Sequence, residues 1–114
     1  MEDDVLFREL FSKIEELPVI DCHEHILGPK REVTRREPIA SLIQGYVQSD
    51  LLSAGITQKE LDILNNNEIE TEEKWELFEK FWKKIEFTAY ARVTRLIMKD
   101  IYGEEEISLQ SILR

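Results

Sequence analysis

The sequence predicts a mostly α-helical chain with one short β-strand. Over most of the 114 residues, apolar side chains recur three and four positions apart, which is the spacing of a helix with one buried face. The exception is an apolar run directly after Pro18, which is too short for a helix and is typical of a buried strand. A hydrophobic content of 42% is enough for one domain with a core.

The first 17 residues form the N-terminal helical segment of this scheme. Phe7, Leu10, Phe11 and Ile14 fall on one helical face, and the acidic residues before them can cap the helix start. Pro18 ends the helix, and residues 18–26 form the predicted strand. An irregular stretch follows from residue 27 to residue 38.

The remainder, up to residue 114, is predicted to be helical. Residues 39–54 form one or two helices, with Gly45 as the interruption and Gly55 just past the end. Three threonines then precede three helical patterns, at positions 57, 71 and 88, and the first of them forms a capping box with Glu60. The last long helix ends near Gly103, and Ser108 caps a final turn. The aromatic residues expected in the core are Trp75, Phe78, Phe81 and Trp82.

Two histidines at the end of the predicted strand form the most informative motif. In an extended chain alternate side chains share a face, so Asp21, His23 and His25 point one way, while Cys22 and Glu24 point the other. Two adjacent imidazoles can bind one divalent metal ion. They are also the only two histidines of the chain, so a third histidine ligand is absent from it.

Each of these residues also has a purely structural interpretation. His23 and His25 can be polar residues at the end of a strand, and Cys22 can be a small buried apolar residue. Glu24 can be a solvated acid. The pattern alone leaves both interpretations open.

Charge and composition exclude several classes of function. The formal net charge of −9 repels phosphate backbones, so nucleic acid is not an expected partner. No apolar run approaches the roughly 20 residues of a membrane span, so no membrane partner is expected either. The acidic start of the chain is unlike a signal peptide, and a single cysteine fits a reducing compartment, so we expect a cytoplasmic protein.

The stretch from Leu17 to His25 resembles the opening of amidohydrolase-superfamily enzymes, which are metal-dependent (β/α)₈ barrels whose first strand ends in His-x-His. Downstream segments, in the same order and at similar spacing, look like the helical insertion of uronate isomerase. These segments are Ser53-Ala54-Gly55-Ile56 before a capped helix, Glu73-Lys74-Trp75 at the start of an aromatic helix, and Tyr90 with the helix ending in Ile101-Tyr102-Gly103.

The resemblance implies a fold and a set of roles. Residues 18–26 would be the first barrel strand and residues 27–114 the helical insertion, in a chain shorter than the roughly 250 residues of a barrel. His23 and His25 would hold a divalent metal, zinc, with Asp21 nearby and further ligands supplied by later strands. The enzyme would act on a small-molecule substrate through metal-activated water or a metal-polarised carbonyl. With two ligands, the isolated chain is expected to show no turnover.

Three hypotheses follow from the sequence. The chain is part of a metal-dependent amidohydrolase-type enzyme, acting as a hydrolase or as a uronate-isomerase-like isomerase. Alternatively it is a non-catalytic helical module that forms homodimers. The third hypothesis is a small metal-binding protein in which two His-x-His pairs form one site between subunits. A homo-oligomer is expected.

Overall fold

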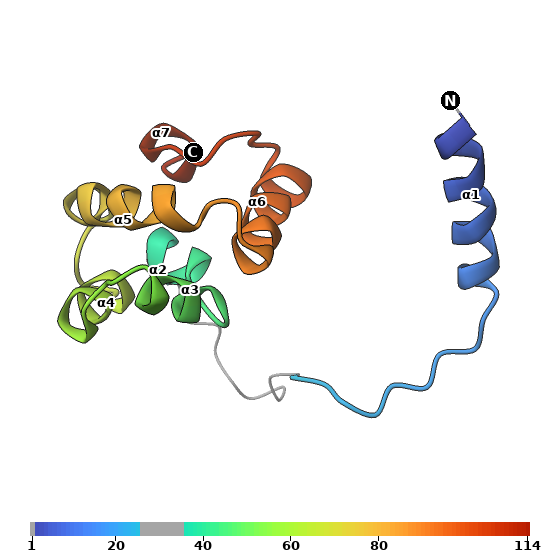
Figure 1. The fold of residues 1–114 in the computed structure, drawn as a ribbon, viewed down its shortest axis with the longest axis horizontal. Helices are drawn as coiled ribbons and strands as arrows, with labels where there is room; N and C mark the ends of the chain where they lie inside the picture. The colour runs from blue at the N-terminus through green and yellow to red at the C-terminus, as the bar shows by residue number, and fades with distance from the viewer. Residues whose placement is uncertain (1, 26–35) are drawn as a thin grey trace. The chain divides into compact units, whose positions relative to one another are not determined.

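A computed structural model of the chain describes residues 2–25 and 36–114, and side-chain exposure from residue 4 onward. The chain divides into two compact units, Met1–Val33 and Thr34–Arg114, which we call the N-terminal unit and the helical unit. The helices of the described residues are α1 (Glu2–Glu15), α2 (Pro38–Leu42), α3 (Val47–Ser53), α4 (Gln58–Asn65), α5 (Thr71–Ile85), α6 (Ala89–Tyr102) and α7 (Leu109–Ile112) (Figure 1).

The predicted strand is wrong. Residues 18–25 have no regular secondary structure, and residue 26 lies outside the described residues. Val19 and Ile20, which were expected to be buried, are 87% and 91% exposed. A strand needs a neighbour to pair its backbone N–H and C=O groups, and neither described part of the chain contains another strand. In this segment the backbone therefore faces water.

The prediction of a (β/α)₈ barrel depended on this strand and is therefore contradicted as well. The described residues form helices only, so they do not show the start of a (β/α)₈ barrel. The predicted irregular stretch of residues 27–38 lies largely outside the described residues. Its final part contains the start of α2, one residue earlier than expected, with Pro38 in the first turn where a missing N–H costs nothing.

The predicted helix starts are confirmed in most cases. Thr57 and Glu60 form the capping box, in which the Glu60 carboxylate accepts the backbone N–H of Thr57 at 2.8 Å. Thr88 caps α6 and Ser108 caps α7. Thr71 differs, because it is the first residue of α5 and its hydroxyl donates to the Glu37 carboxylate, so it joins a tertiary contact.

Two glycines end helical segments as predicted. Gly45 separates α2 from α3 with φ of +89°, and Gly103 ends α6 with φ of +72°. Both values lie in the region where a Cβ atom is strained, so these positions favour glycine even though nothing crowds them.

Helix α5 is central to the core of the helical unit. It packs against α2, α3, α4 and α7, while α6 packs against α3, and Figure 1 shows this group of helices together. Phe78, Phe81 and Trp82 are buried as predicted, whereas Trp75 is only partly buried at the edge. The Phe78 and Trp82 rings stack with centroids 5.6 Å apart.

A buried ion pair lies beside this core. The Nζ atom of Lys74 is 2.7 Å from Oε2 of Glu37, and the two side chains are 0% and 6% exposed. Lys74 also donates to the carbonyl of Leu64 at 3.0 Å, in the last turn of α4, where carbonyls have no partner within the helix. The Glu37 carboxylate accepts the N–H groups of Ile39 and Ala40 and so caps α2. The Glu37–Lys74 ion pair therefore connects α2, α4 and α5.

The Glu37 carboxyl makes the stability of the helical unit depend on pH. Burial by itself would raise its pKa, but hydrogen bonds from Lys74, Thr71, Ala40 and Ile39 together outweigh burial, so the pKa lies below the ordinary 4.5. A lowered pKa in the folded state gives stability that is present above about pH 4.5 and is lost as the pH falls through the folded pKa. We expect the free energy of unfolding to decrease in that acidic window. The decrease should be smaller in Glu37→Gln, as measured by urea unfolding across pH, and equal slopes in both proteins would contradict it.

The described part of the N-terminal unit contains the amphipathic helix α1, whose apolar face is exposed within that unit. Seven apolar residues of α1 and its end are each more than half exposed: Val5, Leu6, Phe7, Leu10, Phe11, Ile14 and Leu17. An isolated helix of this length is marginal in water, so its stability depends on covering this face. None of the described helices has the length and apolar character that crossing a membrane requires.

Candidate functional site

The two histidines lie in the irregular segment after α1. The N–H of Leu17 donates to the carbonyl of Ile14, and Pro18 then prevents the helix from continuing. Further along, the Asp21 carboxylate accepts the backbone N–H of His23 at 3.1 Å, which is the short local turn that aspartate side chains favour. This turn fixes the backbone direction immediately before the histidine pair.

The structure brings the two imidazoles together as predicted. The Nε2 atoms of His23 and His25 are 3.0 Å apart, and the ring centroids are 4.9 Å apart with 60° between the ring planes. At this distance the Nε2–H of one ring donates to the Nε2 lone pair of the other. Both side chains are exposed, so water and ions reach them.

The neighbouring residues do not alternate as they would on a strand. Asp21 and Glu24, which were expected on opposite faces, lie close enough to interact. The Glu24 carboxyl, when protonated, can donate to the Asp21 carboxylate, and this interaction together with the N–H of His23 holds the pKa of the Asp21 carboxyl below its usual value. Cys22 is exposed and not a buried apolar residue. Because residues 18–25 do not form a strand, there is no reason to expect that Cys22 and Glu24 face away from the histidines.

The described residues do not form a complete metal centre. Within residues 2–25 and 36–114, no three histidine, cysteine, aspartate or glutamate side chains gather closely enough to hold an ion. The sequence predicted only two ligands in this chain, so the metal-binding role of His23 and His25 stays a prediction. What the structure contains is a pair of nitrogen donors, His23 and His25.

Sequence reasoning missed two other groups of polar residues. The Glu37–Lys74 pair was not anticipated, although Lys74 lies four residues before Phe78 on the apolar face of its helix. The second group comes from α2, α6, α7 and the segments beside them, and includes Arg36 and Arg114. Their proximity depends on tertiary packing, and no sequence motif joins them.

Comparisons of the chain with protein-family models, with curated proteins and with solved structures gave no match. The resemblance to amidohydrolases therefore stays a prediction made from the sequence.

Proposed function

We propose that this chain supplies a two-histidine half-site for a divalent metal ion in a metal-dependent enzyme of the amidohydrolase type. The proposal is supported by one observation above all, the 3.0 Å separation of the Nε2 atoms of His23 and His25. The enzyme would act on a small-molecule substrate in the cytoplasm.

The geometry of the pair fits a zinc ion. Two nitrogens at about 2.0–2.1 Å from one ion with a tetrahedral angle are about 3.3 Å apart. The observed separation differs from this by about 0.3 Å, which a small rotation of exposed rings can provide. The metal would take the place of the proton between the two rings. When bound with an open coordination position, zinc activates water or polarises a carbonyl.

Two nitrogens are fewer than the three protein ligands of an ordinary catalytic zinc site. The remaining ligands in this proposal come from outside the described residues. A second copy of the chain can supply another histidine pair. Alternatively, a different segment of a longer polypeptide can supply the missing donors. The isolated chain is therefore expected to bind zinc weakly and to show no turnover.

A second candidate is a helical module that pairs with another copy of itself. It is favoured by the uncovered apolar face of α1, where Phe7 and Ile14 are 64% and 61% exposed. In the helical unit, the exposed rings of Tyr46 and Tyr90 stack with centroids 5.3 Å apart, and the exposed Val93 follows Tyr90 by three residues on α6. Both candidates are compatible, because a homodimer would also bring two histidine pairs into one assembly.

Zinc titration against a competing chromophoric chelator tests the metal proposal. We expect His23→Ala and His25→Ala each to lower the zinc affinity at least about tenfold, since even outer partners of metal ligands contribute 10–100-fold. Cys22→Ser is the matched control, because Cys22 lies between the two histidines and is exposed. The control should retain the affinity of the unaltered chain.

Two results would overturn this assignment. Equal zinc affinity in the histidine variants and the unaltered chain would show that the pair is not the site. A loss confined to Cys22→Ser would transfer the site to the thiol. Light scattering on the same samples then shows whether self-association requires the metal or is independent of it, which separates the second candidate from the first.

A further inference from the structure

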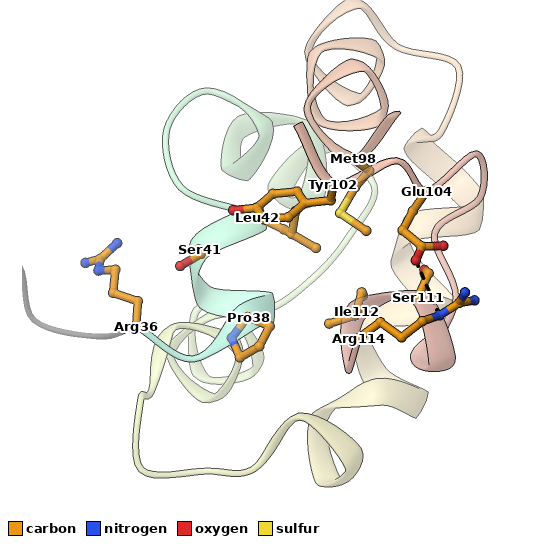
Figure 2. Close-up of a pocket in the computed structure, with 10 residues that line it drawn as sticks. All are labelled: Arg36, Pro38, Ser41, Leu42, Met98, Tyr102, Glu104, Ser111, Ile112 and Arg114. Carbon is orange, nitrogen blue, oxygen red and sulfur yellow. Dashed lines mark ion pairs between the residues drawn. The ribbon is translucent and has the colours of Figure 1, made fainter. Parts of the chain in front are cut away.

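The helical unit contains a pocket of about 370 Å³ bordered by α2, α6 and α7 (Figure 2). This volume lies in the range of small-molecule sites, roughly 300–1,000 Å³. Its apolar lining includes Pro38 and Leu42 of α2, Met98 of α6 and Ile112 of α7. These side chains come from three helices, so the packing of the unit forms the pocket.

Charged and hydroxyl groups line the same pocket. The Nε atom of Arg114 is 3.3 Å from Oε1 of Glu104, which pairs a guanidinium side chain that is 65% exposed with a carboxylate side chain that is 17% exposed. Figure 2 shows this ion pair at one end of the pocket, with Arg36 at the opposite side. The hydroxyls of Ser41 and Tyr102 are also among the lining groups.

This arrangement favours a negatively charged ligand. An arginine whose Nε side faces an acid can still offer its two terminal nitrogens as a fork, and that fork matches a carboxylate. The side chains of Arg36, Arg114 and Glu104 together carry a charge of +1, although the side chains of the chain as a whole carry −9. The apolar lining, meanwhile, suits a hydrocarbon body next to the charged group.

We propose that this pocket binds a small organic monocarboxylate with an apolar body. The carboxylate lies on the terminal nitrogens of Arg114, and the apolar body lies against Leu42 and Met98. All residues that line the pocket belong to the helical unit, so binding here does not depend on the histidine pair.

Benzoate and benzamide form a matched pair of probes, because they share the ring and differ in charge. We expect benzoate, added to the ¹⁵N-labelled full chain, to shift the amide signals of Leu42, Met98 and Ile112 in a saturable way. A dissociation constant on the order of millimolar suits so small a ligand. Benzamide should bind at least about tenfold more weakly, because it lacks the charge-assisted hydrogen bonds.

Substitutions at exposed arginines then locate the carboxylate. Arg114→Gln should weaken benzoate binding about tenfold or more, and Arg114→Lys should restore only part of it, since lysine keeps the charge and loses the fork. Arg92→Gln is the control, because Arg92 is an exposed arginine of α6 outside the pocket lining. The dispersion of the amide spectrum shows that each variant is folded.

Three outcomes would overturn the proposal. The first is an absence of saturable shifts with benzoate, and the second is equal binding of benzoate and benzamide. The third is an equal loss of binding in Arg114→Gln and Arg92→Gln, which would mean that benzoate responds to general positive charge and not to this pocket.

Discussion

Lys74→Met is expected to destabilise the helical unit by about 3–5 kcal/mol, the usual effect of removing one partner from a buried ion pair. The substitution leaves the buried Glu37 carboxylate without its ammonium partner, and it also leaves the carbonyl of Leu64 without a donor. Domains are commonly stable by only about 5–15 kcal/mol, so much of the stability would be lost. Urea unfolding followed by circular dichroism measures the effect.

Lys83→Met is a matched control on the same helix. Lys83 pairs with Glu79 at 3.1 Å, but its side chain is 67% exposed, so its loss should cost only about 0.3–0.5 kcal/mol. A cycle with Glu37→Gln adds a second check, because Lys74→Met should cost less once Glu37 is neutral. Similar costs for the Lys74 and Lys83 variants would contradict the structural role of the buried pair.

Phe78→Ala is expected to cost about 3–5 kcal/mol, because it removes a large aromatic side chain from a site that cannot fully collapse. Phe78 is 0% exposed and lies between two tryptophan rings, with centroid distances of 5.7 Å to Trp75 and 5.6 Å to Trp82. Thermal and urea unfolding, with tryptophan fluorescence as the probe, measure both the loss of stability and the change around the two indoles.

Phe87→Ala is the control for residue type. Phe87 follows α5 and is 84% exposed, and its ring makes one contact of 5.7 Å with the Arg95 guanidinium. Its removal should cost no more than about 1 kcal/mol, the value of an exposed cation–π contact. A Phe78 variant as stable as the Phe87 variant would show that the aromatic stack is not the centre of the core.

The helices could be predicted from the sequence because their determinants are local. Thr57 and Glu60 form a capping box within four residues, and Gly103 ends α6 through its own backbone conformation. The core face of α5 follows from the spacing of Phe78, Phe81 and Trp82. None of these features depends on a distant part of the chain, which is why the pattern was sufficient.

The strand was mispredicted because strand formation depends on a partner. Residues 18–20 have the apolar character of a buried strand, but Val19 and Ile20 are exposed, and no described residue pairs with them as a strand. The proximity of His23 and His25 was nevertheless anticipated, since residues two apart come together in a local turn as well as on a strand. The orientation predicted for Cys22 and Glu24 assumed the alternation of side chains along a strand. Because the strand is absent, that prediction has no basis.

Long-range polar contacts could not be deduced from sequence. Glu37 and Lys74 are 37 residues apart, and each is an ordinary charged residue within a chain that is 34% charged. One clue existed, because Lys74 occupies a position on the buried face of α5 where an apolar residue is expected. A lysine there requires a buried acid, but only the fold identifies Glu37 as that acid.

The most direct test of the account is an equilibrium zinc titration observed through the imidazole ring protons. The chain has two histidines, so each ring signal is assigned by one variant, and weak binding is detected without separating bound from free metal. A shared ion predicts that the ring signals of His23 and His25 shift together with one apparent dissociation constant, and that removing either ring weakens the response of the other. Rings that respond independently, or that do not respond to zinc at all, would contradict a two-histidine metal half-site.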